Sequence, residues 1–185
     1  QDISDILKIV EKNIGYENVV LFITADHGVV SEPKELLERN IPSGYFDGSI
    51  MKTELLAHLD IIYGKGDWIK NYSNNHLFLN HDLIVERNIN LEEIQRKCAQ
   101  FFLKYEWVKN TYTATQLNEN EYQNSFHSLV QRGYNQKRSG DVIVSLETGW
   151  LKSYWKDGGT THGSSYSYDT HVPLIFWGGT IPQGQ

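Results

Sequence analysis

An uninterrupted apolar run near the start of the chain constrains the fold more than any other feature. Residues 18–24 read Asn-Val-Val-Leu-Phe-Ile-Thr, without the alternation of a strand that has one face in water. Such a run is typical of a strand buried on both faces of a parallel sheet. Before it, apolar residues recur at helical spacing, and Gly15 stands where a helix would stop: Ile3, Ile6, Leu7, Val10, Ile14. A helix that leads directly into a buried strand predicts an α/β fold.

Two further runs, residues 141–146 and 171–177, have the same composition of buried strands. We therefore expect residues 19–24, 141–146 and 172–177 to lie in one sheet. The middle of the chain differs, because it is rich in loops and has its own strand and helix signals. Residues 49–63 are expected to be helical, residues 76–85 to form a strand, residues 108–115 to form another, and Asn90 to cap a helix through the spacing to Glu93. These signals predict a small α+β (βαβ) subdomain at 49–119, inserted between core segments 1–48 and 120–185.

Composition excludes several classes of function. The 185 residues carry a net charge of −6, which disfavours a nucleic-acid partner held through its phosphates. The single cysteine, Cys98, excludes an internal disulfide and a cysteine zinc site; on its apolar helical face it is expected to be a small buried hydrophobic residue. No apolar run is long enough to span a membrane. The oligomeric state cannot be read from these features.

Two segments carry candidate chemistry. Asp26 and His27 follow the first predicted strand directly, at the end where ligands collect in open α/β sheets. A carboxylate and an imidazole there can turn toward one cation, although Asp26 could equally cap a turn and His27 be a polar strand end. His162 lies in a polar loop, residues 156–169, just before the last predicted strand. That loop is either part of a site or a flexible surface turn.

Three ordered motifs resemble the alkaline phosphatase superfamily, and in particular its bacterial branch grouped with type I phosphodiesterases and nucleotide pyrophosphatases. The motifs span most of the chain: Thr24-Ala-Asp-His-Gly28, Arg138-Ser-Gly-Asp141, and Gly159-Thr-Thr-His-Gly163 followed by Tyr168-Asp-Thr-His-Val-Pro-Leu174. The resemblance implies an alkaline-phosphatase-like layered sheet, of which this chain would form part.

The resemblance also implies a mechanism. Members of this superfamily hydrolyse phosphate esters with two zinc ions and a Thr or Ser nucleophile that forms a phospho-enzyme. Asp26 and His27 match the ligands of the zinc nearest the nucleophile, and His162 matches a ligand of the other zinc. Asp169 and His171 are candidates for hydrogen bonding around these ligands, with Asp169 fixing the loop. We expect Asp26, His27 and His162 to converge at one rim of the sheet.

The nucleophile and the remaining ligands of the family are expected upstream of residue 1. The chain is therefore expected to be an internal or C-terminal piece of a phosphatase or phosphodiesterase, inactive when expressed alone and periplasmic or secreted as the whole bacterial protein. Its substrate would be a small phosphate ester, with the choice between monoester and diester left open. The alternative is a noncatalytic α/β module that keeps a partial metal site for binding.

Overall fold

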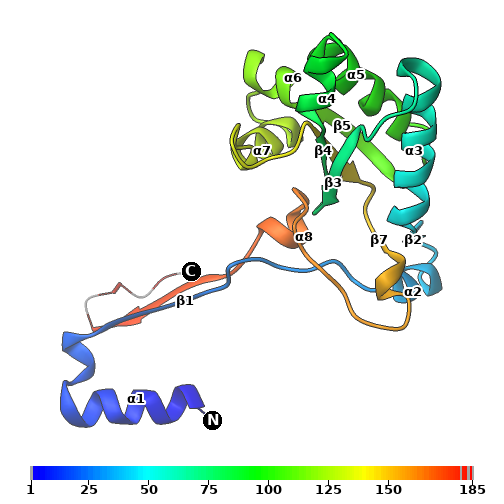
Figure 1. The fold of residues 1–185 in the computed structure, drawn as a ribbon. Coiled ribbons are helices and arrows are strands. Elements are labelled where there is room, and N and C mark those ends of the chain that lie inside the picture. The colour runs from blue at the N-terminus through cyan, green and yellow to red at the C-terminus, as the bar shows by residue number, and fades with distance from the viewer. Residues whose placement is uncertain (1, 180, 183, 185) are drawn as a thin grey trace. The chain divides into compact units, whose positions relative to one another are not determined.

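The computed structural model describes residues 2–179, 181, 182 and 184 (Figure 1). Contacts divide the chain into two compact units. Unit 1 comprises Gln1–Gly28 with Thr170–Gln185, and unit 2 comprises Val29–Asp169. The prediction that residues 49–119 are an insertion in a phosphatase core is not tested by this division and stays a prediction. No described helix combines the length and apolarity needed to cross a membrane.

Unit 1 is built from a helix and a two-stranded ribbon. Helix α1 (Asp2–Asn13) and the short 3₁₀ helix η1 (Tyr16–Asn18) lead into β1 (Val20–Thr24), which pairs with β8 (Leu174–Gly178). The pairing is antiparallel, with Phe22 opposite Phe176 and their ring centroids 6.4 Å apart. The expectation of a strand buried in a parallel sheet is therefore wrong for β1 within the described residues. Its apolar side chains are largely exposed, because β8 is the one described strand that pairs with it.

Unit 2 contains a four-stranded sheet in the order β3-β4-β6-β5. Its strands are β3 (Ile69–Ser73), β4 (His76–Leu79), β5 (Val108–Thr113) and β6 (Val142–Leu146). Both β4 and β5 are antiparallel to β6 and hence parallel to each other. The strand–helix–strand segment expected at 76–115 is thus a split βαβ unit, with β6 inserted between its two strands.

The position of β6 corrects the expectation that residues 141–146 share a sheet with residues 19–24 and 172–177. The apolar run of β6 does mark a strand whose first three residues are buried. However, that burial comes from helices on the two faces of the four-stranded sheet, and the partners of β6 are β4 and β5. An apolar run shows that a strand is buried but does not say in which sheet.

The remaining elements of unit 2 follow the local sequence, with one correction. The strand expected over residues 76–85 ends at Leu79, because Asn80 accepts a hydrogen bond from the Leu83 N–H and so begins a helix at residue 81. Asn90 accepts a hydrogen bond from the Glu93 N–H at 2.9 Å, so the expected cap begins the helix α5. A second, parallel strand pair joins β2 to β7. The helices and these two strands are α2 (Pro33–Glu38), β2 (Gly44–Phe46), α3 (Gly48–Tyr63), α4 (His81–Glu86), α5 (Leu91–Phe102), α6 (Ala114–Glu119), α7 (Phe126–Gly133), β7 (Trp150–Lys152), η2 (Ser153–Trp155) and α8 (Ser167–Thr170).

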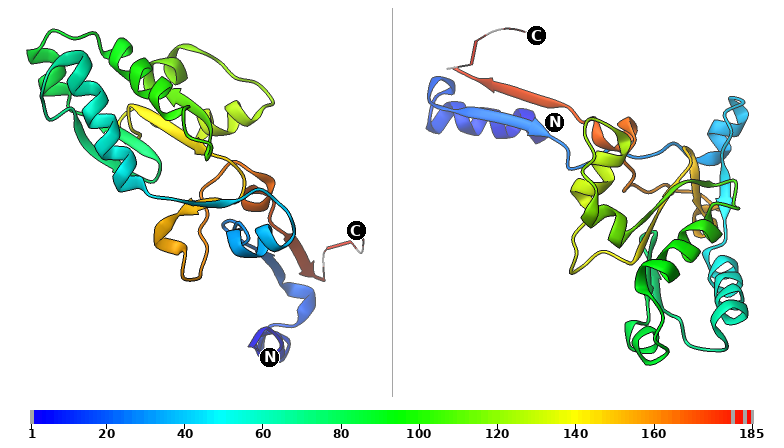
Figure 2. Two further views of the ribbon diagram at one scale, coloured as in Figure 1. Left: turned by 90° about the vertical axis from the view of Figure 1, so that its right-hand side faces the viewer. Right: turned by 90° about the horizontal axis from the view of Figure 1, so that it is seen from above.

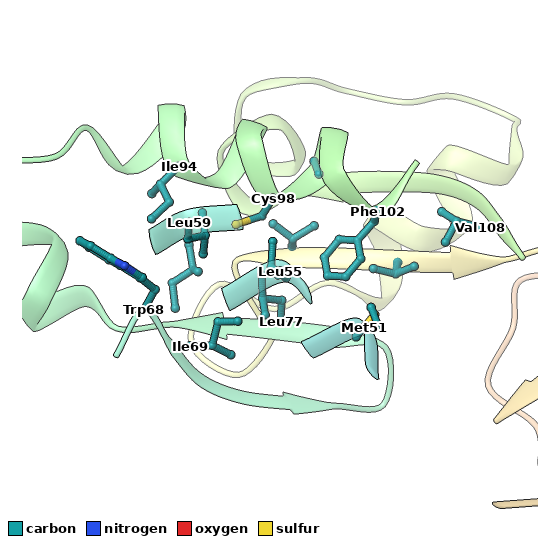
Figure 3. Close-up of a cluster of buried hydrophobic side chains, with 14 of the residues drawn as sticks. Met51, Leu55, Leu59, Trp68, Ile69, Leu77, Ile94, Cys98, Phe102 and Val108 are labelled. Carbon is teal, nitrogen blue, oxygen red and sulfur yellow. The ribbon is translucent and has the colours of Figure 1, made fainter. Parts of the chain in front are cut away.

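Alternate residues of β6 face the two sides of the sheet. Val142 and Val144 belong to the main core, to which α3 and α5 also contribute (Figure 3). Ile143 faces a smaller cluster with Tyr112 of β5 and Leu117 of α6. In Figure 2 these helices can be followed around the sheet of unit 2. Cys98 is fully buried in the main core, as expected, and burial raises the pKa of its thiol to about 12.

Two local irregularities set the register of this sheet. Asn74 and Asn75 form the two-residue link between β3 and β4, with φ values of 50° and 62°. Two consecutive positive φ angles belong to the hairpin turn that fits the twist of the strands, and asparagine tolerates them well. A bulge between Val108 and Asn110 shifts the register of β5. Because the bulge adds a residue, Val108 faces the main core while Tyr112 faces the smaller cluster.

The core of unit 2 predicts a contrast between two positions of α3. Leu59 is completely buried and Ile61 is 84 % exposed. We expect Leu59→Ala to lower the free energy of unfolding by about 2–5 kcal/mol, because it removes a buried side chain and leaves a cavity. Ile61→Ala is the matched control and should change it by less than about 0.5 kcal/mol. Urea unfolding of the chain, followed by circular dichroism, measures both, and equal losses would contradict the core described here.

The imidazole of His76 predicts a pH dependence of stability. Its Nδ1 accepts a hydrogen bond from the Gly140 N–H at 3.0 Å, and burial lowers its pKa below the ordinary value of 6.5. The folded state thus takes up this proton at lower pH than the unfolded state. The contribution of neutral His76 to the free energy of unfolding is therefore complete above pH 6.5 and is lost as pH falls below it.

We expect His76→Asn to flatten this part of the pH profile, because its amide oxygen can accept the same bond without titrating. Urea unfolding between pH 7.5 and about pH 4.5 tests it. An unchanged slope relative to the original chain would contradict the assignment.

Candidate metal centre

Asp26 and His27 place two potential metal-ligand atoms close together directly after β1. Asp26 accepts the His27 N–H at 3.0 Å, and its other oxygen lies 3.5 Å from His27 Nε2. His27 Nδ1 lies 2.8 Å from the carbonyl oxygen of Gly28. Since a carbonyl only accepts, Nδ1 carries the proton in the neutral ring, and Nε2 bears the lone pair. Nε2 and the carboxylate oxygen are then two acceptors side by side, an arrangement that fits two ligands of one cation.

His162 lies on a loop that a buried carboxylate holds in place. Asp169 is 4 % exposed, and its Oδ2 accepts hydrogen bonds from the Gly163 N–H at 3.1 Å and the Ser164 N–H at 2.6 Å. Gly163 has φ of 109°, a conformation that favours glycine. The exposed His162 ring therefore projects from backbone that Asp169 fixes immediately after it.

The segment after Gly28 holds the other side of this loop. The Val30 N–H donates to the Thr161 carbonyl at 3.4 Å, and the Thr160 hydroxyl donates to the Val30 carbonyl. The Gly159 N–H donates to Glu32 Oε1 at 2.7 Å. Sequence reasoning missed Glu32, because no pattern connects two residues 127 positions apart.

The motif at residues 138–141 has a structural role within unit 2. The buried carboxylate of Asp141 accepts hydrogen bonds from the Leu79 N–H at 2.8 Å, from His81 Nε2 at 2.8 Å and from Gln95 Nε2 at 3.0 Å. Gly140 packs so closely on the Leu77 carbonyl that a side chain there would overlap it. Both His81 and His76, which have no recognisable partner spacing in the sequence, are thus hydrogen-bonded to this motif.

The predicted ligands belong to different units, Asp26 and His27 to unit 1 and His162 to unit 2. Their convergence at one rim stays a prediction, as do the roles of Asp169 and His171. His171 is exposed in unit 1. Within the part of the chain that the structure describes, no three His, Cys, Asp or Glu side chains gather into a metal-binding group.

Residues 1–167 match the model of a protein family described as type I phosphodiesterase / nucleotide pyrophosphatase. The chain belongs to this family. The matched range includes Asp26, His27 and His162.

Curated relatives extend the likeness. The chain is 33 % identical over 186 residues to a protein named calcium-transporting ATPase from Myroides odoratus, 29 % over 185 residues to alkaline phosphatase PafA from Elizabethkingia meningoseptica, and 28 % over 188 residues to alkaline phosphatase PhoV from Synechococcus elongatus. All of this chain is covered in each comparison, but only 34 %, 34 % and 33 % of the relative. The chain thus spans about a third of their length.

A solved structure shows the same fold. The crystal structure of wild-type alkaline phosphatase PafA matches with a TM-score of 0.87 and 30 % identity, covering 99 % of this chain and 34 % of that one. The chain therefore has a mixed α/β fold of the alkaline phosphatase type, present in part, as the motifs predict.

The hydrogen bonds that Asp169 accepts predict that removal of its carboxylate loosens the backbone at Gly163 and Ser164. We expect Asp169→Ala to speed amide hydrogen exchange at Gly163 and Ser164 by about tenfold or more, because hydrogen bonds to a charged group contribute about 1.5–3 kcal/mol. Asp157→Ala, an exposed carboxylate of the same loop, is the control and should leave these amides unchanged. Nuclear magnetic resonance of the chain reads both positions, and equal exchange in the two variants would contradict the role of Asp169.

Proposed function

We propose that this chain is the ligand-bearing portion of a zinc-dependent phosphate-ester hydrolase of the alkaline phosphatase type. The observation that carries the proposal is the Asp26–His27 pair, whose two donor atoms lie 3.5 Å apart in a chain whose family comprises phosphodiesterases and pyrophosphatases. Two of the curated relatives are named alkaline phosphatases, which supports hydrolysis of phosphate esters.

Asp26 and His27 would hold one zinc ion, and His162 would contribute to a second. A zinc ion bound there would polarise a phosphoryl oxygen and lower the pKa of an oxygen nucleophile. The Gly28 carbonyl keeps the His27 proton on Nδ1 and so presents Nε2 as the ligand atom. Asp169 orients the backbone that carries His162.

The segment that carries His162 is held in place within unit 2. The Val30 N–H donates to the carbonyl of Thr161, the residue before His162. Ordered backbone of this kind supports His162 as a metal ligand, because ligands must be held in position by their surroundings. The nucleophile would come from a part of the protein outside these residues, as would the choice between monoesters and diesters.

A noncatalytic α/β module that keeps a partial metal site for binding is the second candidate. The Asp26–His27 pair alone would supply such a partial site, which would hold zinc more weakly than ordinary sites with three or more protein ligands. Zinc bound without hydrolysis by a protein that contains this chain together with the remaining length of its relatives would favour the module.

The test is His27→Ala in such a longer protein. We expect loss of bound zinc and a fall of at least about a hundredfold in hydrolysis of p-nitrophenyl phosphate, because even residues that only support a ligand change activity by 10–100-fold. His127→Ala, an exposed histidine outside the motifs, is the control. Zinc content by mass spectrometry and initial rates with p-nitrophenyl phosphate and its bis ester are the readouts. Unchanged zinc and rate in the His27 variant would refute the ligand assignment.

A further inference from the structure

Unit 2 contains a pocket of about 260 Å³ that reaches the loop of His162. Helix α7 contributes Phe126, Leu129 and Val130 to the lining, and β6 contributes residues 143–146. The loop that contains His162 contributes as well, so His162 is part of the lining. Because His162 is a proposed zinc ligand, the pocket adjoins one ligand of the proposed centre.

Four aromatic side chains of the described residues belong to this lining, together with polar residues. Phe126 and Tyr166 lie with ring centroids 5.1 Å apart, and Tyr166 and Tyr168 stack at 5.4 Å, so the rings connect α7 to the loop. Trp150 lines the pocket as well. Walls of this kind bind planar, apolar groups by area burial and ring contacts.

The charges around the pocket are negative. No described lysine or arginine lines it, whereas Glu147 and Asp169 do. Glu147 is 37 % exposed and pairs with Lys109 at 3.4 Å, which partly neutralises it. Asp169 is buried; its Oδ2 accepts two backbone N–H bonds, and its Oδ1 accepts none from the residues that the structure describes. The buried charge beside the pocket is therefore that of Asp169, and a low-dielectric setting screens it poorly.

We propose that this pocket binds the alcohol portion of the substrate, namely an aromatic ring without negative charge, and favours one that carries a positive charge. The inference rests on the proposed function, because it takes His162 to mark the phosphate end. An anionic group such as the phosphate itself is disfavoured inside the pocket by Asp169. The preferred substrates are accordingly phosphate esters of neutral or ammonium-bearing aromatic alcohols.

Binding of the alcohols alone tests the pocket without any catalysis. Three probes share a phenol ring and a two-carbon arm and differ in what the arm carries: an ammonium in tyramine, no further group in 4-ethylphenol, and a carboxylate in 3-(4-hydroxyphenyl)propanoate. We expect tyramine to bind the chain about tenfold or more tightly than the carboxylate probe, with 4-ethylphenol between them. Methyl resonances of Leu129 and Val130 should shift, while those of Leu103 should not. Equal affinity for the three probes, or shifts elsewhere only, would overturn the proposal.

Two variants test separately the space inside the pocket and the charge of Asp169. Leu129→Trp places a large ring at a 40 % exposed pocket position and should weaken tyramine about tenfold or more, whereas Leu103→Trp, at a 53 % exposed position outside the pocket, should not. Asp169→Asn should reduce the ratio of tyramine to 4-ethylphenol affinity. A merely loosened loop would weaken both probes alike, so an unchanged ratio would contradict the role of the charge.

The same series as phosphate monoesters, given to a longer protein with this chain, distinguishes the two proposals. In the original protein we expect kcat/KM to follow the order of the probes. In the Leu129→Trp variant we expect the three esters to have nearly equal kcat/KM. Hydrolysis of all esters at equal rates, unaffected by Leu129→Trp, would overturn the pocket and leave the hydrolase standing. No hydrolysis of any ester, with tyramine still bound by the chain, would overturn the hydrolase instead.

Discussion

The buried carboxylate of Asp141 is the interaction on which the architecture of unit 2 depends. A charge in the core is costly unless hydrogen bonds satisfy it, and this one accepts from the backbone of β4, from His81 of α4 and from Gln95 of α5. Its own backbone bonds to Leu77 and Ala114. The residue directly before β6 is thus hydrogen-bonded to strand β4 and to the three helices α4, α5 and α6.

Two-sided burial of β6 connects this core to the candidate centre. Val142 and Val144 face the main core, and Ile143 faces the cluster below α7 and also lines the pocket. The loop of His162 lines the same pocket. A hydrogen-bonded core therefore supports the part of the lining that β6 contributes, while the loop depends mainly on Asp169 and on the segment around Val30. The candidate substrate pocket thus combines a packed sheet with a loop that few hydrogen bonds hold.

Features that depend on nearby residues could be predicted from the sequence. The cap at Asn90, the helix over residues 49–63 and the Asp26–His27 pair are all set by neighbours within a few positions. The hydrogen bonds that Asp169 accepts from Gly163 and Ser164 of its own loop are local in the same sense. Pairing between strands could not be predicted in this way, because an apolar run indicates burial but does not identify the partner strand. The same limit hid Glu32, whose contact with Gly159 arises only once the chain has folded.

Burial of Cys98 has a practical consequence for how this chain can be observed. A thiol reacts as its thiolate, and the core raises the pKa of Cys98 to about 12 while covering the sulfur completely. The side chain can meet an alkylating reagent only when α3, α5 and the sheet separate. The rate at which Cys98 is labelled in native buffer therefore measures how fast the core opens, and no substitution is needed to observe it.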